Sequence, residues 1–212
     1  MTLKEMKEKT FSLIEEYYPN EPDLAEDEDV INKINGVVNQ IIMDLMTYRK
    51  LPATQTLTVG IEDPHTIDLS TAITNMYQFA KVQLDEDSNG EEAEYSMPFE
   101  TIIELPADYV GNVKVYYYKN PTLCLTQFES EEARRAHDTA YVFDLDPVLL
   151  EIMPYGIAAD LLKMDMISDY GEYFYKRYLE MKQKIDPRKS AGTIKIVGGY
   201  SGWFKRYYNS HI

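Results

Sequence analysis

The spacing of apolar residues predicts helices at both ends of the chain. Residues 2–17 and 28–50 carry apolar side chains at helical intervals, which indicates two amphipathic helices. Thr2 and Glu5 have the spacing of a capping box at the start of the first helix. Pro52 ends the second, since proline cannot continue a helix.

The middle of the chain has a different pattern, in which apolar and polar residues alternate in short runs. The run at 54–61 has period two, which is typical of a half-buried strand. Turn-forming residues separate further strand-like runs at 66–69, 76–84, 99–105, 112–119 and 141–145. Several short strands with such turns predict an antiparallel β-sandwich or meander.

Helical spacing returns after the strands. We expect a short surface helix at 129–138 and longer helices at 154–167 and 169–186, with Pro154 in a first turn. The predicted fold class is α+β, in which N- and C-terminal helices form a small bundle around an inserted antiparallel β-sandwich-like domain, followed by an extended tail. The predicted domains are a discontinuous helical domain (1–53 and 146–187), a β-rich insert (54–145) and a cationic tail (188–212).

Charge is distributed unevenly along the chain. Residues 187–212 hold five basic residues and no acid, so a net charge of −15 leaves −20 for the other 186 residues. This acidic body argues against binding to nucleic acid through a basic face, or to an anionic membrane. The tail either folds back onto the body or reaches another molecule, and its Trp and Arg residues are types enriched at interface anchors.

Candidate chemistry is sparse. The single cysteine, Cys124, stands between two leucines, which indicates a buried strand or turn residue, and only His65, His137 and His211 are available as a base. No metal-ligand spacing or phosphate-binding loop is present, so we predict no catalytic residue, cofactor or metal. The acidic stretch 85–92 predicts a solvated hairpin loop, with a calcium loop as the alternative. A hydrolase that uses paired carboxylates stays open as a hypothesis.

The N-terminus alternates charge and has no apolar segment typical of a signal peptide. No stretch approaches the roughly 20 apolar residues that cross a bilayer. We therefore expect a cytoplasmic protein that is not associated with a membrane. Tyrosine is frequent, with 18 Tyr against 7 Phe. Because tyrosine combines an apolar ring with a polar tip, this composition suits half-buried faces and contacts, including those of a β-sandwich module that binds carbohydrate or protein.

Four stretches resemble the head-to-tail connector (adaptor) proteins of tailed bacteriophages. The stretch 29–52 is similar to their long second helix, and 116–122 resembles their aromatic-then-Pro-Thr turn after the last long strand. Residues 150–162, together with 173–181 and the Asp186-Pro187-Arg188 that follows, resemble their C-terminal helical pair. The resemblance covers most of the chain in order, although the β insert is larger than in minimal helical connectors.

The resemblance implies a non-enzymatic virion-assembly protein, located in the host cytoplasm during assembly and then at the head–tail junction. Such proteins form rings, commonly of twelve subunits, under the portal, and many are monomers when isolated. They extend the DNA channel without reading sequence, and an acidic wall would let the duplex slide. Their C-terminal segments often grip the portal or the next subunit, and the corresponding residues here would be Arg188, Lys189, Ile194, Ile196, Trp203, Phe204, Lys205 and Arg206.

Overall fold

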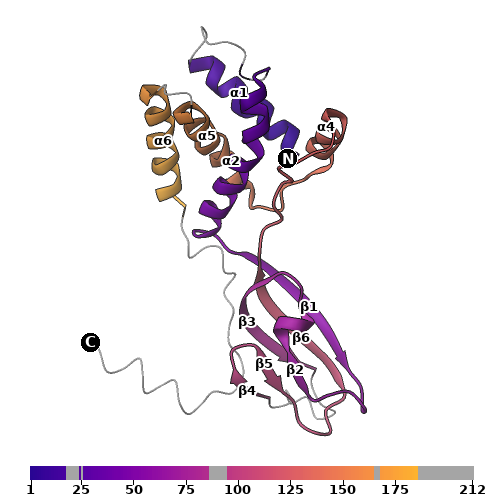
Figure 1. Ribbon diagram of the computed structural model, residues 1–212. Helices are drawn as coiled ribbons and strands as arrows, with labels where there is room; N and C mark the ends of the chain where they lie inside the picture. Colours follow the sequence, from indigo (N-terminus) through magenta and orange to yellow (C-terminus); the bar gives the residue numbers. More distant parts are fainter. Residues whose placement is uncertain (18–23, 25, 86–94, 165–167, 186–212) are drawn as a thin grey trace, which may run out of the picture. The chain divides into compact units, whose positions relative to one another are not determined.

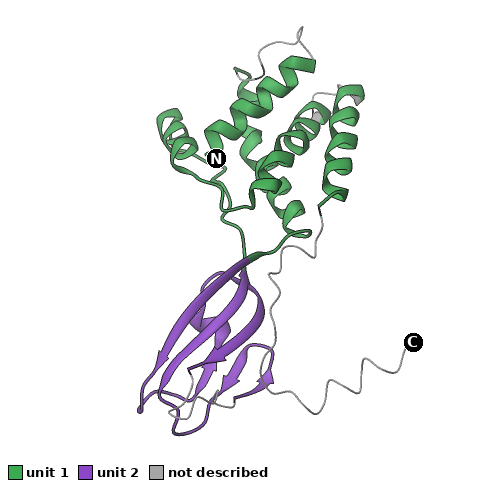
Figure 2. Cartoon of the chain, turned by 180° about the vertical axis from the view of Figure 1, so that it is seen from behind, with its two compact units in different colours: residues 1–51, 119–190 green, residues 52–118, 191–212 purple. Residues whose placement is uncertain are grey.

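The computed structural model describes residues 1–17, 24, 26–85, 95–164 and 168–185. The chain divides into two compact units (Figure 2). One, the helical unit, combines residues 1–51 with 119–190, and the other, the β unit, has 52–85 and 95–118 as its described part. Helices from both ends of the chain therefore share one unit, and the predicted α+β class with antiparallel strands is confirmed.

The helical unit is built around α5, which packs against three other helices (Figure 1). Its helices are α1 (Leu3–Tyr17), α2 (Glu28–Met46), α4 (Glu131–Ala140), α5 (Pro147–Met164) and α6 (Ser168–Gln183). α5 contacts α1, α2 and α6, whereas α4 contacts α1. The apolar stripe of α2 supplies much of the core, with Ile34, Val38, Ile42 and Leu45 almost fully buried.

The helix starts follow from side chains that can accept backbone hydrogen bonds. In the predicted capping box, the Glu5 N–H donates to Thr2 Oγ1 (3.2 Å) and the Thr2 N–H donates to Glu5 Oε2 (2.8 Å). Asp27 caps α2 by accepting from the N–H groups of Asp29 and Val30. Each cap satisfies donors that the first turn of a helix leaves unpaired.

The predicted start of the third long helix, at Pro154, is wrong. α5 begins at Pro147, and Pro154 lies inside it. The Val148 N–H donates to Asp146 Oδ1 (2.9 Å), so Asp146 caps the helix and Pro147 occupies the first helical position, where proline costs no hydrogen bond. This earlier cap adds Leu149, Ile152 and Met153 to the buried face of the helix.

The β unit is a small sandwich of two three-stranded sheets. One sheet has the order β1–β6–β3 and the other β2–β5–β4. The elements are β1 (Leu51–Val59), β2 (Thr66–Asp68), α3 (Leu69–Ala72), β3 (Met76–Leu84), β4 (Ser96–Phe99), β5 (Ile102–Glu104) and β6 (Gly111–Lys119). β5 pairs antiparallel with β2, with Ile67 opposite Ile103. One hydrophobic cluster contains residues of both sheets, among them Val82, Ile103 and Val113.

The predicted insert of 54–145 is too long. Residues 119–145 belong to the helical unit, because Cys124, Phe143 and Leu145 are buried in its core. The strand predicted at 141–145 is an isolated bridge between Thr2 and Val142. The alternation is real, but Val142 bridges to the start of α1 and not to a sheet of the β unit.

Candidate functional site

The extended segment 122–126 runs along α2 and is held there by side chains of that helix. Asn39 Nδ2 donates to the Cys124 carbonyl (2.9 Å), and the Cys124 N–H donates to Asn39 Oδ1 (2.8 Å). Asn35, one turn earlier, donates to the Leu125 carbonyl (2.7 Å). Side chains thus satisfy backbone groups that a neighbouring strand would pair in a sheet.

This anchoring presents two leucines to solvent. Cys124 is 5% exposed, but Leu123 on one side is 45% exposed and Leu125 on the other is 59% exposed. Next to the segment, residues of the start of α2 and of 126–135 line a hollow of about 790 Å³. Its lining combines the apolar side chains of Ile31 and Phe128 with charged groups such as Glu28 and Arg134. A held backbone, exposed leucines and an adjacent hollow together suit docking to another protein.

Cys124 lies close to other groups that can carry chemistry, but its surroundings favour the neutral thiol. Burial raises the pKa of Cys124 to about 11. His137 Nε2 accepts the Leu125 N–H (3.3 Å), and Lys7 donates to Asp138 (2.6 Å). Burial also lowers the pKa of Lys7. A nucleophilic cysteine needs a lowered pKa, so this cluster joins segment 122–126, α1 and α4 and does not activate a thiolate.

A second polar cluster lies among α2, α5 and α6. Asp44 Oδ2 accepts from the Tyr178 hydroxyl (2.5 Å) and from Lys182 Nζ (2.5 Å). Lys182 Nζ also lies 4.3 Å from the ring centroid of Tyr48, a favourable cation–π contact. The side chain of Lys182 is only 7% exposed, so Asp44 supplies the charge partner that a buried ammonium group requires.

The hollow beside this cluster has a volume of about 270 Å³. Asp160 contributes to its lining, and burial raises the pKa of this carboxyl group. Gly156 lies at the same place, where a Cβ atom would come within 2.9 Å of Ile41 Cδ1 and 3.0 Å of Tyr178 Cε2. A larger residue here would force the end of Ile41 and the Tyr178 ring to shift, so glycine favours the close packing of α5 against α2 and α6.

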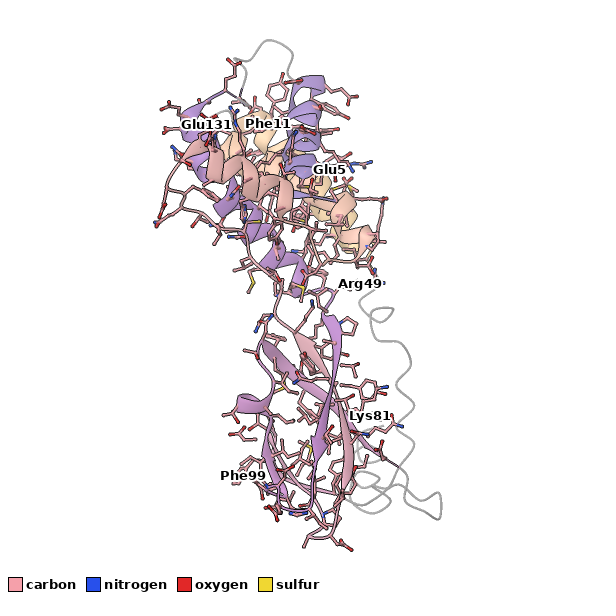
Figure 3. All side chains as sticks on the ribbon, turned by 90° about the vertical axis from the view of Figure 1, so that its right-hand side faces the viewer. Glu5, Phe11, Arg49, Lys81, Phe99 and Glu131 are labelled. Carbon is pink, nitrogen blue, oxygen red and sulfur yellow. The ribbon has the colours of Figure 1, made fainter. Side chains whose placement is uncertain are left out.

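In the β unit, polar and aromatic side chains gather on the outward face of the β1–β6–β3 sheet. Lys114 and Tyr116 alternate along β6 with Val113 and Val115, which are buried. The Thr58 hydroxyl donates to Asn112 Oδ1 (3.0 Å), linking β1 to β6 on this face. In Figure 3, Lys81 of β3 and Phe99 of β4 lie on opposite sides of the β unit. Each sheet therefore has one face on the shared core, and its other face carries exposed side chains such as Lys114 and Phe99.

The residues predicted to bind partners all lie outside the described residues. They are Arg188, Lys189, Ile194, Ile196, Trp203, Phe204, Lys205 and Arg206. Most of the acidic stretch 85–92, with its hairpin and calcium alternatives, also lies outside them, and only Asp85 is described. Across the described ranges, no group of three His, Cys, Asp or Glu side chains could hold a metal ion.

Sequence reasoning missed the asparagine anchors. Asn35 and Asn39 are polar residues inside the apolar stripe of α2, at a spacing that puts them on the same helix face. Two amides at that spacing on a core-facing side indicate that the helix binds another chain segment's backbone, and this signal could have identified the anchored segment.

Within the part of the chain that the structure describes, no helix has the length and apolar character needed to cross a membrane. No protein-family model and no curated protein matches this sequence.

Proposed function

We propose that this chain is a structural virion-assembly protein, a head-to-tail connector that binds the portal ring and extends the DNA channel toward the tail. The observation that carries the proposal is the discontinuous helical unit, in which residues 1–51 and 119–190 pack together while the strands between them form a separate unit. This is the element order on which the resemblance to connector proteins rests.

The four stretches that resemble connector proteins lie in the helical unit or at its border. The stretch 29–52 contains most of α2, and 150–162 and 173–181 lie in α5 and α6, which pack against each other. The stretch 116–122 carries the chain from β6 into segment 122–126 of the helical unit. All four therefore lie in the helical unit or lead into it.

Two parts of the chain are proposed to contact the portal. The cationic tail would supply charged and aromatic anchors, and segment 122–126 would supply an apolar contact through Leu123 and Leu125. The acidic body would line a channel without holding DNA, since surfaces of like charge release the duplex. The proposed role involves a ring of subunits, no cofactor and no chemical step.

Truncation tests the role of the tail. A chain that ends before Pro187 should keep its fold but lose binding to the portal protein encoded by the same genome. Binding can be measured by sedimentation with purified portal rings, and ring formation by electron microscopy. Unchanged binding and ring formation would remove the tail from the mechanism.

Substitution tests the anchored segment separately. Replacing Leu123 and Leu125 with serine should weaken portal binding, because both side chains are exposed and their loss removes apolar area from an interface. Val148→Ser is the matched control, since Val148 is 46% exposed on α5 of the same unit. Equal binding by the leucine variant and the control would exclude the segment from the interface.

A second candidate function is a β module that binds carbohydrate or another protein ligand. The outward face of the β1–β6–β3 sheet favours it, because Tyr116 and Tyr118 follow one another at alternate positions of β6. Aromatic rings beside hydrogen-bonding side chains suit the flat faces of sugars. Glycan-array binding that disappears in the double variant Tyr116→Ala and Tyr118→Ala would support this function, and no binding on a broad array would count against it.

A further inference from the structure

Two lysines meet at one tyrosine ring on the outward face of the β1–β6–β3 sheet. Lys81 Nζ of β3 lies 5.6 Å from the ring centroid of Tyr116, and Lys114 Nζ of β6 lies 5.4 Å from it. The Tyr116 hydroxyl donates to Gln83 Oε1 (3.0 Å), which fixes the ring between the two strands. The ring attracts both ammonium groups. The two ammonium groups repel each other, and a bound anion would reduce that repulsion.

Among the described residues, no ion pair neutralises the positive charge of these two lysines. Neither Lys81 nor Lys114 forms an ion pair with any described carboxylate. Asp85, which follows β3, accepts two hydrogen bonds from Asn112, from its backbone N–H (2.8 Å) and from Nδ2 (2.9 Å). These donors are neutral, so Asp85 keeps its negative charge, and with the two lysines the described charged groups here remain positive on balance. We name this surface the lysine–tyrosine face (Lys81, Gln83, Lys114 and Tyr116).

The helical unit carries a surface of opposite charge at the start of α2. Four consecutive acidic residues, Glu26 to Asp29, precede and begin this helix, and all four are exposed. Asp27 caps the helix and Asp29 pairs with Lys33 (3.5 Å), but Glu26 and Glu28 have no ion-pair partner among the described residues. The two glutamates are therefore available to cations of another molecule.

We propose that the lysine–tyrosine face of one copy of the chain binds the Glu26–Asp29 patch of the next copy. The charges are complementary, because two ammonium groups would face two carboxylates, and none of the four has an ion-pair partner among the described residues. The contact joins different surfaces of identical chains, and such heterologous contacts generate rings when the rotation closes. The inference rests on the proposed ring assembly, for which it names the contact between neighbouring subunits.

Charge also argues against two other molecules as partners of the lysine–tyrosine face, namely the C-terminal tail and a nucleic acid. The tail from 187 to 212 holds five basic residues and no acid, so it would be repelled by the two lysines. The two lysines would attract a nucleic acid, but the acidic body would repel it. Two lysine–phosphate contacts alone give weak, salt-dependent binding. The acidic patch of a second copy has neither disadvantage.

Charge reversal on each surface tests the contact. The face variant is Lys81→Glu with Lys114→Glu, and the patch variant is Glu26→Lys with Glu28→Lys, which leaves the Asp27 cap intact. Lys4→Glu with Lys9→Glu on α1 is the matched control, because both lysines are exposed and the change in net charge equals that of the face variant. Circular dichroism confirms the fold, and sedimentation at low ionic strength measures self-association with and without portal rings.

We expect each variant alone to lose at least about tenfold in its self-association constant, because like charges then face each other. An equimolar mixture of the two variants should associate again, since each reversed surface finds its complement on the other chain. The control should associate like the unchanged chain, and added salt should weaken association.

Three results would overturn the inference. They are an unchanged chain that stays monomeric with portal rings present, a face variant that associates normally, or a mixture that fails to associate. Loss of binding to a labelled DNA duplex in the face variant, without loss of self-association, would assign the face to nucleic acid instead. Portal binding that persists in the face variant would leave the connector proposal standing while self-association decides the subunit contact.

Discussion

The helical unit and the β unit bury their cores in different ways. The helical unit joins distant parts of the chain, and it encloses polar groups with dedicated partners, such as Lys182 with Asp44 and the Cys124 backbone with Asn39. The described part of the β unit comes from residues 52–85 and 95–118, and its core is smaller and is contributed by one face of each sheet. Its other faces carry threonine, tyrosine and lysine side chains.

The two units therefore differ in what their polar side chains do. Those of the helical unit specify how the unit folds, and those on the β sheet face solvent, where they can bind. In the helical unit a buried charge or amide fits one arrangement only, because an unpaired group would cost free energy. In the β unit the outward side chains contact one another at the surface, as Tyr116 does with Gln83, so a substitution there leaves the buried core residues in place. We therefore expect substitutions in the helical unit to act mainly on stability, and those on the sheet face to act mainly on association.

The largest expected effect compares the two cores directly. Phe174→Ala should lower the free energy of unfolding of the helical unit by about 3–5 kcal/mol, because its fully buried ring packs against Tyr17 and Tyr173. Ile103→Ala should lower that of the β unit by about 2–5 kcal/mol. Residue-resolved hydrogen exchange measures the stability of each unit separately. A loss of protection in both units from either substitution would contradict the expectation that each substitution acts on its own unit.

The next effect concerns the buried ion pair. Asp44→Ala should destabilise the helical unit by about 1–3 kcal/mol, because Lys182 and the Tyr178 hydroxyl both lose their acceptor. Lys182→Met removes the buried charge itself and keeps an apolar chain, so its cost should be smaller. Chemical denaturation of both variants shows which substitution lowers the free energy of unfolding more. A larger cost for Lys182→Met would show that the pair adds net stability.

A smaller effect is expected from the anchor of segment 122–126. Asn39→Ala removes two hydrogen bonds to the Cys124 backbone and should cost about 1–2 kcal/mol, while hydrogen exchange of the Cys124 N–H should become faster. The matched control is Asn32→Ala, because Asn32 is an exposed asparagine of the same helix. Unchanged exchange at Cys124 in Asn39→Ala would show that other contacts hold the segment.

The effect that is smallest at neutral pH comes from Cys124, because it appears only at alkaline pH. Its pKa is raised from 9.0 to about 11 in the folded chain, so the folded state keeps a proton that the unfolded state releases. The associated stability is complete below pH 9 and is lost as the pH rises toward 11. Cys124→Ala should show a shallower decline over this range in thermal melts, and equal slopes would contradict the raised pKa.

Local signals in the sequence predicted much of this structure. The capping box of Thr2 and Glu5 and the limits of β3 at residues 76 and 84 agree with the prediction, because they depend on neighbouring residues. The end of the insert was wrong, since the burial of Phe143 against helices distant in sequence has no local signature. The lysine–tyrosine face could not be predicted either, because strand order brings Lys81 and Lys114 together.

The measurement that tests the central proposal most directly is electron microscopy of portal rings incubated with the 212-residue chain. We predict an added ring, coaxial with the portal, into which the helical unit and the β unit can each be fitted. Portal rings that remain bare, with the chain soluble and folded beside them, would contradict the connector function.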